Sequence, residues 1–203
     1  MEINNSLIQA AKAFAQEIFA ADSSGHDYYH TLRVHALTRT IAEAEGANVA
    51  IAELAALLHD VDDHKLSPET AQDKGRAVSF LRQQDVPEAD IHNIVRIIDQ
   101  ISFSRNTLPP DSLEGKCVQD ADRLDALGAI GIARTFAFGG SHGRAIHDPT
   151  GMDRGSSIAH FYDKLLLLSD RMNTTTGKAM AQHRHEFLQE FLNEFLAEWD
   201  GNR

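Results

Sequence analysis

The chain has 203 residues, of which 42% are hydrophobic, and it carries a formal net charge of −11. Such a chain can bury a full hydrophobic core and need not contain more than one domain. The acidic balance argues against a general nucleic-acid-binding protein, because that affinity depends on a basic surface that neutralises phosphates. A small phosphorylated substrate remains compatible with it, since a bound cation and a few basic side chains suffice.

The compartment can also be inferred from composition. The single cysteine, Cys117, excludes an intramolecular disulfide and a cysteine-based zinc cluster, and it fits a reducing environment. No apolar run approaches 18 residues, so we expect no membrane partner. The N-terminus lacks the basic and apolar regions of a signal peptide. We therefore expect a cytoplasmic protein.

Hydrophobic residues recur at helical spacing along the whole chain, and no segment alternates in the manner of a strand. We expect one all-α domain over residues 1–203, a helical bundle of eight or so helices. Glycines near residue 130 are expected to let helices approach closely, and the glycine-rich stretch 138–154 is expected to be a loop. The helices are predicted at about 6–21, 27–44, 48–59, 67–84, 86–101, 112–136, 156–168 and 174–199.

The most informative stretch is 51–65, in which an Ala- and Leu-rich core helix ends in His59 and Asp60. A carboxylate in an apolar setting either takes up a proton or finds a cation. A divalent metal ion stabilises both side chains at once, because neutral imidazole and carboxylate are suitable ligands. The alternative is that His59 and Asp60 only cap the helix and hydrogen-bond to each other.

Further ligands should be His, Asp or Glu on otherwise apolar helix faces. His30 meets this criterion one turn before Val34, and Asp122 lies in a helix of small and apolar residues, flanked by Asp120 and Asp125. Each of them alone is more often a surface charge or a satisfied core residue. Together with His59 and Asp60 they indicate a metal site.

The ordered set resembles the H…HD…D signature of the HD-domain metal-dependent phosphohydrolases. The resemblance extends from about residue 20 to Trp199, with its signature core at about 26–126, and it is close to small single-domain bacterial members that include nucleotide pyrophosphohydrolases. It implies the all-α HD-domain architecture and the metal ligands His30, His59, Asp60 and Asp122, with Asp120 as the alternative fourth ligand. The segments that carry the resemblance are Gly25–His30, His59-Asp60, Gln119–Arg134 and Phe138-Gly-Gly.

The expected cofactor is a divalent metal ion with open positions for water and a phosphate oxygen. Mixed imidazole and carboxylate ligands admit Mn, Mg, Co, Ni, Fe or Zn without choosing among them. Asp63 lies where related enzymes place an acidic general base, with Asp62 as the alternative. Either of them can instead be a solvated loop charge.

Positive charge for a substrate phosphate is expected from Lys65, directly after the ligand cluster, and from Arg33 and Arg144. Lys65 is also a candidate catalytic residue. Lys164 is a further candidate for a phosphate contact. The loop around Arg144 lacks the Gly-Lys-Ser/Thr ending of a P-loop, so its glycines are weak support for a phosphate cradle.

Two other histidines suggest alternatives to this site. His26 and His30 are four residues apart, like the histidines of zinc metalloproteases, but Asp27 stands where that motif needs Glu. His26 is therefore expected to cap the helix or to orient His30. His64 with Asp63 is a candidate for a second metal.

These residues predict a metal-dependent phosphohydrolase of a small phosphorylated substrate. Cleavage of a nucleoside triphosphate into a monophosphate and pyrophosphate is implied by the resemblance alone. The alternatives are a nucleoside monophosphate phosphatase and a metal-bound nucleotide sensor without turnover. The aromatic-rich last helix can supply the face of a homodimer as easily as core.

Overall fold

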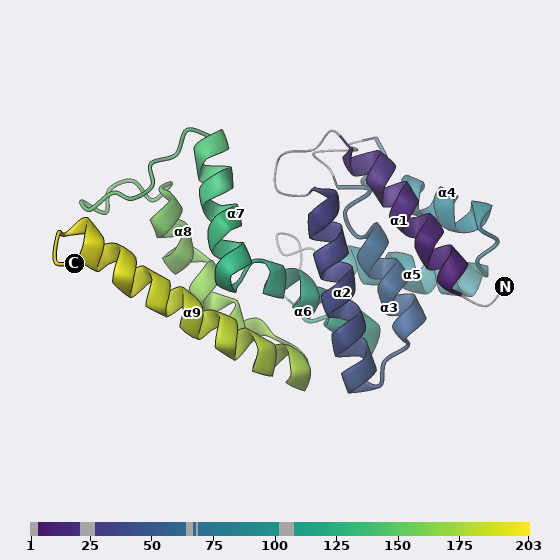
Figure 1. Cartoon of the computed structure of the whole chain (residues 1–203). Helices are drawn as coiled ribbons and strands as arrows, with labels where there is room; N and C mark the ends of the chain where they lie inside the picture. The colour runs from purple at the N-terminus through teal and green to yellow at the C-terminus, as the bar shows by residue number, and fades with distance from the viewer. Residues whose placement is uncertain (1–3, 21–26, 64–66, 68, 102–107) are drawn as a thin grey trace. The chain divides into compact units, whose positions relative to one another are not determined.

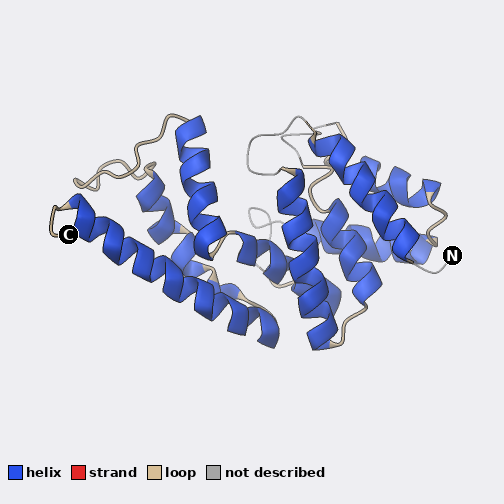
Figure 2. Ribbon diagram, in the orientation of Figure 1, coloured by secondary structure: helices blue, strands red, loops and turns tan. Residues whose placement is uncertain are grey.

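The computed structural model describes all residues except 1–3, 21–26, 64–66, 68 and 102–107. Within that part of the chain, every regular element is a helix and no strand occurs (Figure 2). The all-α prediction is confirmed. The α-helices of Figure 1 are α1 (Asn5–Phe19), α2 (Tyr28–Glu45), α3 (Val49–Leu58), α4 (Gly75–Gln83), α5 (Glu88–Ile101), α6 (Leu113–Asp125), α7 (Gly128–Ser141), α8 (Ser157–Asp163) and α9 (Thr175–Trp199).

The chain forms two compact units, Met1–Ala121 and Asp122–Arg203. The boundary falls inside α6, so this helix begins in the first unit and its last residues belong to the second. The assignment of residues 1–203 to one domain stays a prediction. No helix in the described segments is both long and apolar enough to cross a membrane.

The first unit is built around α3, which packs against α1, α2 and α5. Seven residues of α3 are buried, on all sides of the helix. A helix that is apolar all round has to be surrounded by other elements to be stable. Asn48, where this helix is predicted to begin, caps α3, and its side chain accepts a hydrogen bond from the backbone N–H of Ile51. α3 ends at Leu58, so His59 is held at the end of a buried helix.

The ends of the neighbouring helices are set by side-chain caps. Asn4 caps α1, which therefore begins at Asn5, one residue before the predicted start. Asp27 caps α2, which ends at Gly46 with a φ of 73° in the left-handed region where glycine is favoured. The predicted helix start at Ser67 is wrong, because turns occupy residues 69–74 and α4 begins only at Gly75.

The predicted helix 112–136 is instead two helices, α6 and α7, joined by a turn. Gly128 has a φ of 67°, which a side chain rarely adopts. A Cβ on Gly131 would lie 2.2 Å from the carbonyl oxygen of Ala126. These glycines are therefore required by the turn between the helices. α7 also extends to Ser141, into the expected loop, and the predicted helix 156–168 ends as α8 at Asp163, followed by the short 3₁₀ helices Leu165–Leu167 and Ser169–Arg171.

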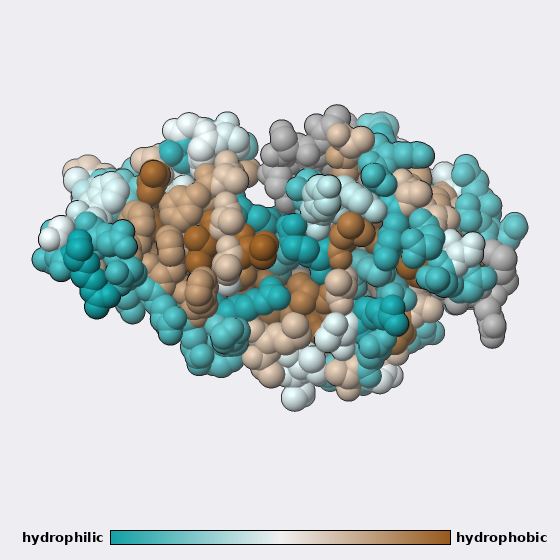
Figure 3. All heavy atoms as spheres, in the orientation of Figure 1, coloured by the Kyte–Doolittle hydropathy of each residue, from teal (hydrophilic) through white to brown (hydrophobic). Residues whose placement is uncertain are grey.

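The second unit has an aromatic core between α7, α8 and α9. Phe136 of α7 lies 6.0 Å from Phe161 of α8 and 5.9 Å from Phe191 of α9 between ring centroids. Rings at such separations pack favourably in tilted or offset arrangements. Phe161 is completely buried and Phe191 is half-buried, whereas Phe187 and Trp199 of α9 remain 43% and 46% exposed. Figure 3 shows further hydrophobic side chains gathered over α7 on the visible face. The predicted homodimer is untested by this structure.

We predict that Gly128→Ala destabilises the protein by about 1–2 kcal/mol, because the left-handed conformation disfavours a side chain. The new Cβ would also lie 3.1 Å from Cγ of Arg184. Urea unfolding measures this loss. The matched control is Gly140→Ala in α7, where a Cβ meets nothing within 4 Å. This control should be neutral or slightly stabilising, and equal effects of the two substitutions would contradict the prediction.

Candidate metal centre

His30 lies in the first turn of α2, and it is only 1% exposed. The carboxylate of Asp27 accepts a hydrogen bond from the backbone N–H of His30 at 2.8 Å. This cap fixes the backbone at the point where the histidine enters the core. Asp27 therefore serves the helix, in agreement with its departure from the metalloprotease pattern. His26, the other histidine of that pattern, lies outside the described residues.

His59 directly follows α3, and its side chain is 4% exposed. Its Nδ1 lies 2.7 Å from the carbonyl oxygen of Ala56. A carbonyl oxygen only accepts hydrogen bonds, so Nδ1 has to carry the hydrogen. Nε2 then carries the lone pair that a metal ion requires. Metal-ligating histidines commonly donate their other ring N–H to a carbonyl or carboxylate in this way.

Asp60 brings its carboxylate against both imidazoles. Its Oδ2 lies 3.2 Å from Nε2 of His59 and 3.6 Å from Nε2 of His30. The two imidazole rings are 5.4 Å apart between centroids. The prediction that this dipeptide and His30 belong to one site is consistent with these distances.

Asp122 completes the group. One ligand atom each from His30, His59 and Asp122 lies within 4.8 Å of the other two. Asp122 lies within α6, directly after Ala121, the last residue of the first unit. Asp120 is completely buried and is not part of this group. The group contains neither Asp60, which contacts both imidazoles, nor Asp120, and it therefore favours Asp122 over Asp120 as the ligand from α6.

These residues fit a divalent cation. Metal–ligand bonds of about 2.1 Å, at angles of about 90–110°, place ligand atoms about 3.0–3.4 Å apart. The distances from Asp60 to the two imidazoles, 3.2 and 3.6 Å, are close to this range. The donor set of neutral imidazole and carboxylate suits divalent first-row metal ions, Mn²⁺ among them.

The segment after Asp60 is tightly held. The backbone N–H of Asp63 donates to the carbonyl oxygen of Asp60 at 2.9 Å, and the carbonyl oxygen of Asp63 accepts from the N–H of Ser67 at 2.8 Å. Asp63 is half-buried. Asp62 is 2% exposed, and its carboxylate accepts hydrogen bonds from the backbone of α4. This geometry favours Asp63 over Asp62 as a general base.

His64 and Lys65, predicted as a second-metal ligand and a substrate contact, lie outside the described residues.

The residues predicted to contact a substrate phosphate differ in their burial and in the side chains around them. Arg33 lies on α2, one turn after His30, and is half-buried. Arg144 is exposed in the second unit, and its guanidinium lies 5.0 Å from the ring centroid of Phe138. Burial lowers the pKa of His160, and the positive charges of Lys164 and Arg144 lower it further. Lys164 and Arg144 therefore both act on the surroundings of this histidine.

The end of α6 is held by arginines that spacing in the sequence does not reveal. Arg134 of α7 donates a hydrogen bond of 2.8 Å to the carboxylate of Asp125, which is 1% exposed. Arg184 of α9 donates to the carbonyl oxygen of Leu124. Burial lowers the pKa of Arg184, and the negative charge of Asp125 partly offsets that effect. These contacts fix the turn of α6 that follows Asp122.

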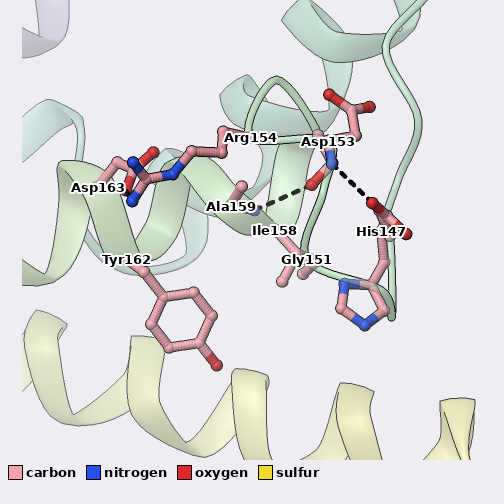
Figure 4. A pocket seen from close by; sticks show the side chains of 10 residues that line it. His147, Gly151, Asp153, Arg154, Ile158, Ala159, Tyr162 and Asp163 are labelled. Atoms are coloured by element: carbon pink, nitrogen blue, oxygen red, sulfur yellow. Dashed lines mark hydrogen bonds and ion pairs between the residues drawn. The ribbon is translucent and has the colours of Figure 1, made fainter.

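A separate pocket of about 200 Å³ lies in the second unit between the 147–156 segment and α8 (Figure 4). Its rim is shaped by Asp148, whose carboxylate accepts hydrogen bonds from the backbone of Thr150 and Asp153. These bonds and the Thr150 hydroxyl lower the pKa of Asp148 to about 2. Neither Arg144 nor a candidate metal ligand lines this pocket. The predicted chemistry therefore does not belong to it.

Comparison with known proteins agrees with this class of site. The HD domain family model matches residues 27–127. YpgQ of Bacillus subtilis is 43% identical over 184 residues, which cover 87% of this chain and 86% of YpgQ. The chain belongs to the HD-domain family.

Solved structures extend the similarity to the whole fold. A protein of Lactobacillus plantarum is 40% identical, with a TM-score of 0.84, over 98% of this chain and 100% of its own. An HD-superfamily hydrolase of Bacillus thuringiensis is 44% identical, with a TM-score of 0.81, over 95% of this chain and 96% of its own. YpgQ in complex with ADP has a TM-score of 0.80 at 35% identity, over 97% of this chain and 96% of its own. The protein is thus a metal-dependent hydrolase of the phosphohydrolase class, as the sequence predicted.

We predict that Asp122→Asn weakens binding of Mn²⁺ by at least about 100-fold, because an amide replaces a charged ligand. Isothermal titration of the apoprotein with Mn²⁺ measures this change. Asp120→Asn is the matched control on the same helix, and it should change the affinity by less than about 10-fold. The reverse order of the two effects would make Asp120 the fourth ligand.

Proposed function

We propose that this protein hydrolyses nucleoside triphosphates between the α- and β-phosphates, releasing a monophosphate and pyrophosphate. The observation that carries the proposal is the meeting of His30, His59 and Asp122 in one group, with Asp60 against both imidazoles. The similarity to YpgQ, whose structure contains ADP, supports a nucleotide as the substrate. We also propose the cytoplasm as its location, because such a nucleotide pool exists there.

The chemistry divides between the metal and the side chains around it. A divalent ion supplies a water of lowered pKa and neutralises charge that develops on phosphate oxygens. In our proposal, His30, His59, Asp60 and Asp122 hold this ion. Asp63 accepts the proton of the attacking water, since a positioned carboxylate can act as the general base.

The substrate phosphates require further positive charge in a protein with a net charge of −11. We assign this role to Lys65, Arg33 and Arg144. A guanidinium can bind two phosphate oxygens at once, and an ammonium acts as a point charge. Lys65, which follows the ligand segment directly, also stabilises the transition state in this proposal.

The test is a panel of nucleoside mono-, di- and triphosphates incubated with the manganese-loaded protein, with orthophosphate and pyrophosphate resolved. Mn²⁺ is the first metal to use because the donor set admits it, and Mg, Co, Ni, Fe and Zn follow. Pyrophosphate together with a monophosphate supports the proposal. Orthophosphate alone would instead indicate a monophosphatase or removal of the terminal phosphate. Metal binding without release of either product would point to a nucleotide sensor.

We predict that Asp63→Asn lowers kcat by about 10²–10⁴-fold with little change in KM, because removing a general base acts on the chemical step. Steady-state kinetics with the best triphosphate measures both constants. Asp90→Asn, on α5, is a control that should leave them unchanged. An equal rate for Asp63→Asn and the unmodified protein would remove Asp63 from the mechanism.

A further inference from the structure

Asp62 connects the ligand segment to α4. Its two carboxylate oxygens accept hydrogen bonds from the backbone N–H groups of Arg76 at 3.1 Å and Ala77 at 3.0 Å. These are the second and third residues of α4. The N–H groups of a first helical turn have no partner within the helix, and a carboxylate placed there also interacts favourably with the helix dipole. Asp62 thus caps a helix that begins 13 residues further along the chain.

α4 does not provide this cap itself. Its N-cap residue, Lys74, has a φ of 55° and makes no capping hydrogen bond with its side chain. The Lys74 ammonium instead donates to the carbonyl oxygen of Ala71 at 2.8 Å and lies 3.7 Å from a carboxylate oxygen of Asp99 on α5. The start of α4 is therefore open to a cap from another element, and Asp62 occupies that position.

The same segment is fixed at its neighbouring residues. The Oγ of Ser67 donates to the carbonyl oxygen of Val61 at 3.1 Å, and both residues are completely buried. The N–H of Ser67 donates to Asp63. Asp60, the candidate ligand, is only two residues before Asp62. A shift of the Asp62 side chain would therefore move the backbone that carries Asp60 and Asp63.

The charge of Asp62 matters as well as its hydrogen bonds. Asp60, Asp62 and Asp63 place three carboxylates within four residues. Like charges this close repel each other, and each could compete for a cation. The first turn of α4 holds one of the three away from the imidazoles. Asp60 then remains beside the imidazoles of His30 and His59. Asp63, three residues after Asp60, is half-buried.

We propose that Asp62 is a positioning residue for the metal centre, acting through α4 to hold the 59–63 segment in the geometry that binds the metal. The inference rests on the proposed metal site. A cap with a purely structural role would contribute to stability alone. If Asp62 is a positioning residue, its substitution weakens metal binding more than another substitution in α4 that lowers the stability by a similar amount.

The test compares Mn²⁺ dissociation constants, measured by electron paramagnetic resonance of free Mn²⁺, with urea unfolding of the same apoproteins. Asp62→Ala removes both acceptors, and Asp62→Asn keeps one acceptor oxygen at nearly the same volume. We expect Asp62→Ala to weaken Mn²⁺ binding by about 10–100-fold, with Asp62→Asn in between, as for other groups that orient ligands.

The matched control is Phe80→Leu in the same helix. Phe80 is 6% exposed and stacks on Phe14 of α1 at 4.6 Å between ring centroids, so the substitution weakens the packing of α4 on α1 and leaves the hydrogen bonds of Asp62 to Arg76 and Ala77 in place. Its dissociation constant should stay within about 2-fold of the unmodified value, because the two hydrogen bonds that Asp62 accepts are retained.

Three outcomes decide the matter. Unchanged Mn²⁺ affinity in Asp62→Asn overturns the positioning role, as does equal weakening in Phe80→Leu. If Asp62→Ala does not fold, Asp62→Asn and Phe80→Leu alone give the comparison. If the unmodified protein binds neither Mn²⁺ nor any other divalent ion, the metal site of the proposed function is overturned. That result differs from one in which the unmodified protein binds Mn²⁺ and the Asp62 variants bind it equally well.

Discussion

His59 and Asp60 directly follow α3, a helix buried on all sides, and the imidazole of His30 lies beside them. Desolvation on this scale is costly for a charged group unless a partner of opposite charge is present. The Nδ1 of His59 lies 2.7 Å from the carbonyl oxygen of Ala56, and the Nε2 atoms of His59 and His30 lie 3.2 and 3.6 Å from Oδ2 of Asp60. The packing of α2 against α3 brings His30 close to His59 and Asp60.

The ligands are few, but the contacts that hold them are spread over several elements. In the first unit, Ser67 and the start of α4 restrain the segment that follows His59. In the second unit, Arg134 and Arg184 restrain the end of α6, beyond Asp122. A metal centre placed at helix ends needs such restraints, because the last turn of a helix is its least constrained part.

Much of this could be read from the sequence, because it depends on local patterns. The helical spacing, the caps at Asn48 and Gly46, and the ordered histidines and aspartates each act over a few residues. The start of α4 was missed because its cap comes from Asp62, outside the helix. The break between α6 and α7 was missed because the glycine run reads equally well as a close helix contact. The pairing of Asp125 with Arg134 depends on tertiary packing, and no spacing predicts it.

Cys117, the only thiol of the chain, is completely buried in α6, five residues before Asp122. Burial, reinforced by the negative charges of Asp120, Glu45 and Glu114, raises its pKa to about 12. Oxidants and alkylating reagents attack the thiolate, and this side chain is almost entirely protonated near neutral pH. Inactivation of the protein by mild oxidation would therefore not be traced to this thiol; the exposed Met152, or a ferrous ion if the site holds one, is the more accessible target.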